Sequence, residues 1–321
     1  MSDKKIIAVV GATGAQGGGI ARAILDDPTG PFALRALTRD VNSPAARALA
    51  ERGAEVVAAD LDDEASVRRA FQGAYGAFVV TNFWADRTPE QEAARDRAQM
   101  EIDQARTAAA AAKAEGLKHV VWSTLDDSRP VLDFLGSDAP TLMGRFKVPH
   151  FDAKAEADAF FREQGVPTTF LQTTMYYESV TGGMKPQRGE DGTLALVMPM
   201  GDSTLTLVAV EDIGRTAYGI FLKGSEFIGR TVGIAGEHLT GKELAEILAE
   251  SAGEPVEYRP LTIEQFRGDG SFPISEAAAN IQFYQEADAY FVRTRDIALT
   301  RELNPRLVGL REWLRTQPSW V

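Results

Sequence analysis

The 321-residue chain contains no cysteine, and this absence excludes several kinds of chemistry. Disulfides, thiolate nucleophiles, zinc ribbons and iron–sulfur clusters all require cysteine. Histidine is also scarce: the only three are His119, His150 and His238, which lie far apart and form no HExxH-type pair. We therefore expect no metal site in this protein.

Long apolar runs and basic clusters are missing too. No stretch approaches the roughly eighteen apolar residues of a membrane span, and the short run after Lys5 is too brief for a signal peptide. The net charge of −12, from 34 basic and 46 acidic residues, would repel a phosphate backbone. We expect a cytoplasmic globular protein that binds neither nucleic acid nor a membrane.

Short apolar runs alternate with helical segments through the first 175 residues. This alternation is typical of a parallel sheet wound with helices. Strands are predicted at residues 5–10, 32–38, 54–58, 76–81, 118–123 and 168–173, and helices at 15–27, 44–52, 63–72, 89–116 and 151–165. The fold class is therefore α/β, a Rossmann-type doubly wound parallel sheet.

The alternation fades after residue 175. Strands are expected there at 193–198 and 231–235, and helices at 211–222, 240–252, 274–287 and 305–316. We predict an NAD(P)-binding domain over residues 1–175 and a smaller C-terminal α+β lobe for substrate or partner over 176–321, with some interleaving. Residues 126–149 fit no clean period, and so long a connection is typical of a lid or binding loop.

A glycine loop, Gly11-Ala12-Thr13-Gly14-Ala15-Gln16-Gly17, stands between the first strand and the first helix. Small residues let the backbone turn tightly and approach a pyrophosphate, whose charge then lies on the N–H groups of the helix N-terminus. The strand before the loop and the helix after it predict a dinucleotide site. A second glycine loop, Gly236 to Lys242, lacks the following Ser or Thr of a P-loop and is not read as an ATP site.

The end of the second strand indicates which dinucleotide binds. NAD-binding sites usually place a carboxylate there for the ribose 2′-hydroxyl, whereas this strand ends in Thr38-Arg39. A guanidinium suits a 2′-phosphate, so NADP(H) is favoured over NAD(H). Asp40 could instead pair with Arg39.

These motifs resemble those of the NmrA-like, HSCARG-type branch of the atypical short-chain dehydrogenases. The resemblance spans nearly the whole chain and implies a Rossmann domain that binds NADP(H). Besides the glycine loop and Thr38-Arg39, it rests on residues 53–63, Thr81-Asn82-Phe83-Trp84, Val120 to Thr124, His150 to Lys154, Asp296 to Pro305 and Trp313-Leu314.

The resemblance also implies which residues contact the cofactor. Thr81 and Asn82 would face its central ribose, Phe83 would border the cleft, and Lys154 would reach its nicotinamide ribose. Tyr176 would flank the nicotinamide in a segment where Ser179 replaces an Asn common in the family. The full set implied is Gly11, Thr13, Gly14, Ala15, Gln16, Gly17, Thr38, Arg39, Asp60, Leu61, Thr81, Asn82, Phe83, Ser123, Lys154 and Tyr176.

The catalytic pair of short-chain dehydrogenases is incomplete. That pair is a Tyr with a Lys four residues later, and no lysine here has a Tyr at that spacing. His150 precedes Lys154 instead, so these two are the candidate catalytic residues, although His150 could simply begin a helix and Lys154 could pair with Asp158. Two functions stay open: a cofactor or redox sensor acting on a protein partner, and an NADPH-dependent reductase of a small carbonyl, quinone or imine.

Overall fold

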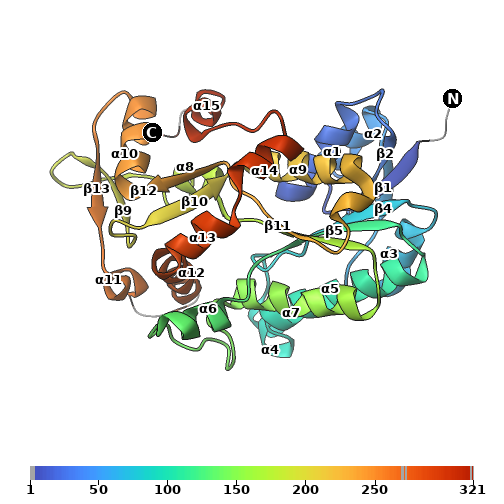
Figure 1. Ribbon diagram of the computed structural model, residues 1–321, viewed down its shortest axis with the longest axis horizontal. Helices are drawn as coiled ribbons and strands as arrows, with labels where there is room; N and C mark the ends of the chain where they lie inside the picture. The colour runs from blue at the N-terminus through green and yellow to red at the C-terminus, as the bar shows by residue number, and fades with distance from the viewer. Residues whose placement is uncertain (1–3, 269–270, 272, 319, 321) are drawn as a thin grey trace. The chain divides into compact units, whose positions relative to one another are not determined.

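Seven strands form the central sheet of the computed structural model, which describes residues 4–268, 271, 273–318 and 320 (Figure 1). Their order is β11-β6-β5-β4-β1-β2-β3, and the strands from β6 to β3 pair in parallel. In the centre Ala8 lies opposite both Arg35 and Ala77. The direction of chain winding reverses between β1 and β4, the position where doubly wound sheets bind ligands.

The chain divides into two compact units by its internal contacts. Unit 1 comprises Met1–Asp126, Ala153–Gln172 and Ile213–Val232, and unit 2 comprises Asp127–Asp152, Thr173–Asp212 and Gly233–Val321. The elements associated with unit 1 are β1 Lys5–Val10, α1 Ala15–Leu25, β2 Phe32–Thr38, α2 Pro44–Glu51, β3 Glu55–Ala58, α3 Glu64–Phe71, β4 Gly76–Val79, α4 Pro89–Ala94, α5 Arg97–Ala114, β5 His119–Thr124, α7 Pro149–Glu163, β6 Thr168–Gln172, α9 Val210–Lys223, the 3-10 helix Gly224–Phe227 and β11 Thr231–Gly233.

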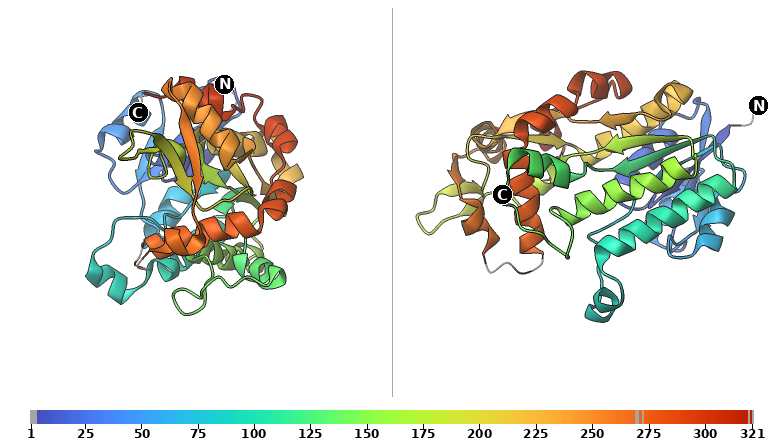
Figure 2. Two further views of the ribbon diagram at one scale, coloured as in Figure 1. Left: turned by 90° about the vertical axis from the view of Figure 1, so that its left-hand side faces the viewer. Right: turned by 60° about the horizontal axis from the view of Figure 1, so that its bottom comes forward.

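Helices cover both faces of the central sheet. α3, α5 and α7 lie on one face, where the long helices α5 and α7 run side by side (Figures 1 and 2). Alanines such as Ala105, Ala108 and Ala112 of α5 let this layer approach the buried Trp122 of β5. On the other face α9 crosses α1 so closely that a Cβ on Gly214 would lie 2.1 Å from the backbone nitrogen of Ile20.

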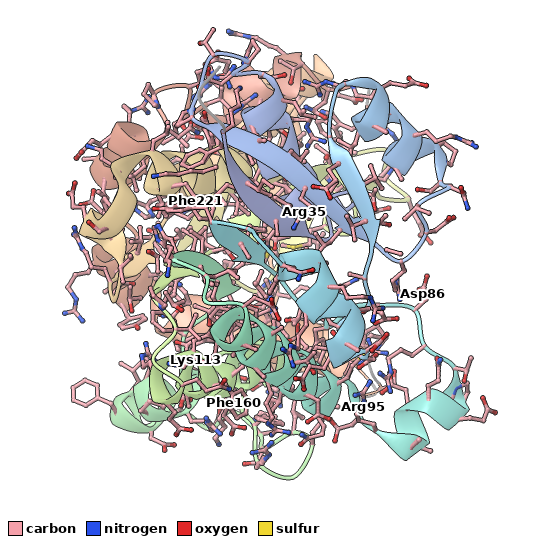
Figure 3. All side chains as sticks on the ribbon, turned by 90° about the vertical axis from the view of Figure 1, so that its right-hand side faces the viewer. Arg35, Asp86, Arg95, Lys113, Phe160 and Phe221 are labelled. Atoms are coloured by element: carbon pink, nitrogen blue, oxygen red, sulfur yellow. The ribbon has the colours of Figure 1, made fainter. Side chains whose placement is uncertain are left out.

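One arginine ties the edge of this sheet to the helix beside it (Figure 3). Arg35 of β2 donates hydrogen bonds to the carbonyl oxygens of Ala70 and Gln72, at 3.0 and 2.7 Å, at the end of α3. Its Nε also pairs with Glu55 of β3 at 2.8 Å. Carbonyl groups at a helix C-terminus have no partner within the helix, so a cation there satisfies them.

Unit 2 contains two small sheets, β12-β10-β7 and β13-β9-β8. Its elements are α6 Ser128–Leu135, β7 Met175–Tyr176, α8 Tyr177–Thr181, β8 Gln187–Arg188, β9 Leu194–Met198, β10 Thr204–Val208, β12 Glu237–Thr240, α10 Gly241–Ala252, β13 Val256–Pro260, α11 Ile263–Arg267, α12 Ile274–Glu286, α13 Asp288–Thr294, α14 Ile297–Leu303 and α15 Leu310–Arg315. No helix among the described residues is both long and apolar enough to cross a membrane.

The structure corrects two of the sequence-based expectations for the chain. The single helix predicted over residues 89–116 is interrupted, because Arg95 is extended and Asp96 caps a new helix through the backbone N–H of Gln99. Residues 126–149, predicted to be irregular, contain α6, which Asp127 caps and Gly136 ends in a left-handed conformation. Several strands of unit 2 were also not expected: β7, β8, β10, β12 and β13.

Candidate functional site

The glycine loop lies between β1 and α1 and is shaped by contacts that only glycine allows. Gly11 has a φ of +64°, and the N–H of Gly14 donates to its carbonyl oxygen at 2.8 Å. A Cβ on Gly17 would lie 2.3 Å from that same oxygen, a contact that backbone atoms cannot relieve. The loop therefore holds its tight turn, and Thr13, Gly14 and Ala15 are exposed on it.

The first turn of α1 is open to an anion. Gly14 is its N-cap and provides no side-chain hydrogen bond. The first N–H groups of a helix have no partner within the helix, and the positive end of the helix dipole adds to their attraction for negative charge. Loop and helix together make a site suited to a pyrophosphate.

Arg39 stands exposed just beyond β2. Its side chain has no hydrogen bond or ion pair among the described residues. Asp40, the alternative partner, forms no ion pair with it in the described part of the chain; its carboxylate accepts a hydrogen bond from the N–H of Asn42 at 2.9 Å. Thr38 accepts one from the N–H of Asp40 at 3.3 Å, which fixes the turn. The guanidinium is therefore available to an added phosphate.

Asp60 and Leu61 follow β3 on the same edge of the sheet. The N–H of Asp60 donates to Ser66 at 3.0 Å, and its carboxylate accepts from the N–H of Asp62 at 3.0 Å. Leu61 packs against the apolar core of unit 1. Both residues are half-buried, so they can border a ligand without first unfolding the loop.

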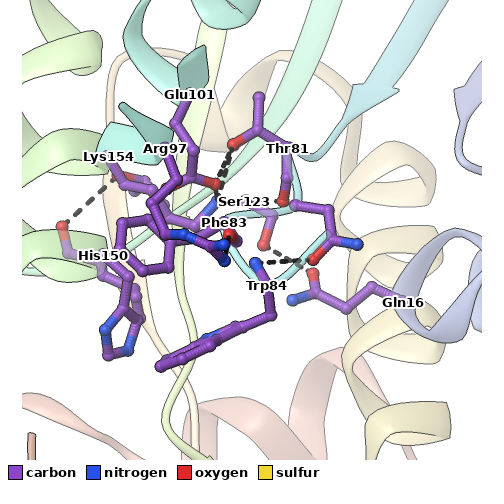
Figure 4. A network of polar contacts seen from close by, with 12 residues as sticks. Gln16, Thr81, Phe83, Trp84, Arg97, Glu101, Ser123, His150 and Lys154 are labelled. Carbon is purple, nitrogen blue, oxygen red and sulfur yellow. Dashed lines mark hydrogen bonds and ion pairs between the residues drawn. The ribbon is translucent and has the colours of Figure 1, made fainter. Parts of the chain in front are cut away.

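Lys154 reaches from α7 to the end of β4 and is engaged there by three hydrogen bonds (Figure 4). Its Nζ lies 2.7 Å from the hydroxyl and 3.2 Å from the carbonyl oxygen of Thr81, and 2.8 Å from Oε1 of Glu101. All three residues are buried. The alternative role of Lys154, a surface pair with Asp158, does not form: Asp158 is buried and accepts from Trp122 and Thr124.

The residues after Thr81 turn outward and are fixed by α5. Asn82 is exposed, and its amide oxygen accepts from the N–H of Trp84 at 3.1 Å. Phe83 is 2% exposed, with its carbonyl oxygen 2.8 Å from the guanidinium of Arg97. Trp84 is 46% exposed and lies edge-on to Phe83. After the end of β4, Trp84 is therefore the exposed aromatic side chain, and the Phe83 ring that it contacts is buried.

Ser123 joins the end of β5 to the glycine loop. Its hydroxyl donates to the amide oxygen of Gln16 at 2.6 Å, and both side chains are buried (Figure 4). Ser123 and Gln16 thus brace the first turn of α1 from inside. The sequence placed both in the cofactor site but did not suggest that they contact each other.

His150 is the second residue of α7 and is held by Glu276 of α12 within unit 2. One carboxylate oxygen of Glu276 lies 2.5 Å from the ring Nδ1 of His150 and 3.0 Å from its backbone N–H. Both side chains are buried. His150 therefore has the helix-start position that the sequence offered as its ordinary role, together with a carboxylate partner that the sequence did not reveal.

Tyr176 and the segment before α7 also belong to unit 2. Tyr176 is half-buried and pairs with Val208 of β10. Asp152 accepts from the backbone N–H groups of Ser128, Lys147 and Val148, at 2.7 to 3.1 Å, so one carboxylate fixes both ends of the 128–148 segment. Burial raises the pKa of Asp152.

Three important residues escaped sequence reasoning. Glu101 and Arg97 lie one turn apart on α5 and hold the residues after β4, and Glu276 holds His150. For Arg97 and Glu101, the only signal in the sequence was a charged pair four residues apart in an alanine-rich helix. Such a pattern is more often a solvent-exposed pair.

Known proteins resemble this chain in sequence and in fold. The model of the NmrA-like family matches residues 3–314. The NmrA-like family domain-containing oxidoreductase FrzB of a Cladobotryum species is 30% identical over 272 residues, which cover 80% of this chain and 76% of FrzB. The corresponding oxidoreductase ptmS of Penicillium ochrochloron is 26% identical over 309 residues, covering 90% and 86%.

Two solved structures have the same fold. The negative transcriptional regulator NmrA in complex with NADP has a TM-score of 0.73 at 21% identity, with 98% of this chain and 95% of NmrA covered. Triphenylmethane reductase of Citrobacter sp., complexed with NADP(H), has a TM-score of 0.71 at 19% identity, with 97% and 99% covered. Likeness at this identity concerns the fold, which supports both a regulator and a reductase.

Proposed function

Because this chain belongs to the NmrA-like family, we propose that it binds NADP(H) across the carboxyl edge of its central sheet. The glycine loop carries the proposal: a Cβ on Gly17 would fill the turn, and α1 begins without a side-chain cap. These features suit the pyrophosphate of a dinucleotide. The NADP complexes of NmrA and of triphenylmethane reductase support the same ligand.

Each part of the cofactor has residues in place for it. Arg39 would take the 2′-phosphate, and Asp60 and Leu61 would border the adenine. Thr81, Asn82 and Lys154 would contact the nicotinamide half beyond the end of β4. The two halves of a dinucleotide extend to opposite sides of the point where the winding reverses. Tyr176 is proposed to flank the nicotinamide.

We propose further that the bound cofactor acts as a signal of cofactor level or redox state to a protein partner. The Tyr-xxx-Lys pair is missing from the sequence, and Lys154 is engaged by Thr81 and Glu101 rather than by a phenol. An ammonium group held in this way is suited to fix a ribose. Among the described residues its hydrogen bonds go to Thr81 and Glu101, and none goes to a phenol whose pKa it could lower for proton transfer.

A reductase is the second candidate, favoured by the relatives named oxidoreductases. NADPH would supply a hydride to a small carbonyl, quinone or imine. Lys154 would orient the cofactor, and the proton would come from Lys154, from His150 or from a tyrosine elsewhere. Both candidates require the same cofactor site.

Titration with NADPH and NADH tests the binding site. Arg39→Ala is expected to weaken NADPH binding by about 2 kcal/mol, about thirtyfold, because a charge-assisted pair is lost, and to leave NADH binding nearly unchanged. Arg69→Ala is the matched control, since Arg69 is an exposed arginine in the last turn of α3. Equal losses for both cofactors would show that Arg39 does not contact the 2′-phosphate.

Single-turnover oxidation of bound NADPH separates the two candidates. The protein with one equivalent of NADPH is mixed with quinones, aldehydes, ketones and imines, and the absorbance of NADPH is followed. Binding without oxidation by any class supports the sensor. Rapid oxidation that is lost in Lys154→Ala establishes the reductase and identifies its substrate class.

A further inference from the structure

Glu101 and Lys154 form a buried ion pair in unit 1. Their charged atoms are 2.8 Å apart, and their side chains are 1% and 10% exposed. Charges removed from water in this way are costly unless they are paired, and they act on one another through a low effective dielectric. The two side chains therefore form a locally neutral unit in which each charge compensates the other.

The Glu101 carboxylate depends on Lys154 for its charge compensation. Oε1 of Glu101 accepts hydrogen bonds from both Lys154 and the hydroxyl of Thr81, the latter at 2.7 Å. Oε2 of Glu101 is buried and has no hydrogen-bond partner among the described residues. Half of this carboxylate is thus bare, and its negative charge is balanced mainly by Lys154.

The fold puts this pair on one side of the proposed cofactor site. Thr81 follows β4, which lies beside β1 on the side opposite β2. A dinucleotide whose pyrophosphate rests on α1 and whose 2′-phosphate lies at Arg39 extends its other half toward the ends of β4 and β5. Glu101 and Lys154 therefore belong to the nicotinamide half.

That half of the cofactor changes charge with its redox state. The oxidised nicotinamide ring carries a positive charge and the reduced ring carries none. A lysine without its carboxylate would repel only the oxidised form. At an effective dielectric of about 20, Coulomb's law makes this repulsion roughly tenfold in affinity for two unit charges about 12 Å apart.

We propose that Glu101 determines how strongly the site discriminates between NADP⁺ and NADPH, by neutralising the charge of Lys154. The inference rests on the proposed function and deepens it, because a protein that reports redox state must bind the two forms with a defined ratio. Glu101 is thus a specificity-determining residue that acts through Lys154.

The test measures the dissociation constants of NADPH and NADP⁺, by cofactor fluorescence and by competition, at pH 6 and pH 8. Glu101→Gln is expected to raise the ratio Kd(NADP⁺)/Kd(NADPH) about tenfold, equivalent to about 30 mV for a two-electron couple. Lys154→Met, which leaves Glu101 unbalanced, should lower the ratio. The double variant should return it to the wild-type value.

Glu115→Gln is the control, because Glu115 ends the same helix and pairs with Arg68. It should leave the ratio unchanged, and circular dichroism checks that every variant is folded. If Glu101 had a purely structural role, its loss would weaken the binding of NADP⁺ and of NADPH equally. An unchanged ratio of dissociation constants in Glu101→Gln at both pH values therefore overturns the inference, and so does a double variant that fails to restore the wild-type ratio. Failure of the wild-type protein to bind either form would instead refute the proposed function.

Discussion

Asp158 makes the stability of unit 1 depend on pH in an unusual direction. Its Oδ1 accepts hydrogen bonds from Trp122 at 2.9 Å and Thr124 at 2.8 Å, and the side chain is 9% exposed. Burial raises the pKa of Asp158 from 3.8 to about 6. The folded protein therefore holds this proton more tightly than the unfolded chain does.

The direction and size of this pH dependence follow from the linkage between proton binding at Asp158 and folding. Stability contributed by a raised pKa is fully present below the unfolded pKa of 3.8 and is lost as the pH rises through the folded pKa of about 6. The complete loss is about 3 kcal/mol, and about 1.4 kcal/mol of it falls between pH 5 and pH 7.5. Asp158→Asn should remove this part of the pH dependence, because the amide oxygen can still accept from Trp122 and Thr124.

Urea unfolding at pH 5, 6, 7 and 7.5, followed by tryptophan fluorescence, measures the effect, since Trp122 is itself buried beside Asp158. Asp158→Asn also removes the ion pair with Arg162. This loss should change the free energy of unfolding little, because the arginine side chain is 53% exposed. Asp103→Asn, which removes a half-buried carboxylate paired with Arg106, is the control and should keep the wild-type slope. The same slope in Asp158→Asn as in the wild type would refute the reasoning.

Three further predictions concern the loop, the 128–148 segment and turnover. Gly17→Ala should abolish measurable NADPH binding and lower the melting temperature, since its Cβ meets backbone; retained affinity in a titration would contradict the described loop. Asp152→Ala should speed tryptic cleavage within residues 128–148, because backbone N–H groups lose their acceptor, and an unchanged digest would show that other contacts hold the segment. If the protein is a reductase, Lys154→Ala should lower kcat/KM more than tenfold in steady-state assays, and unchanged kinetics would eliminate that role.

The sequence predicted the central sheet well because its signals are local. Continuous apolar runs mark buried parallel strands, and the glycine loop marks the turn after the first of them. β1 and β2 were predicted with the bounds observed, and the helices that start at Pro89 and Gly241 begin within one residue of the predicted positions. Unit 2 was harder to predict, because strands of two to five residues such as β7 and β10 carry too little periodicity.

The polar network was beyond sequence reasoning for a different reason. Lys154 and Asp158 have the spacing of a surface pair, yet the fold turns both inward toward different partners. Glu101 and Lys154 are 53 positions apart, and Glu276 and His150 are 126 apart, so only the folded chain brings them together. Residues that follow strand ends could be placed in advance, while their helical partners could not.

The path of the chain has a consequence for how this protein can be divided or recombined. The chain passes between unit 1 and unit 2 five times, at residues 126, 152, 172, 212 and 232, and two of these crossings lie inside the helices α7 and α9. A single cut therefore cannot release either unit whole, and a cut at residue 152 would expose an uncapped helix end. A gene fusion that carries one continuous stretch of the chain would therefore not transfer either unit whole.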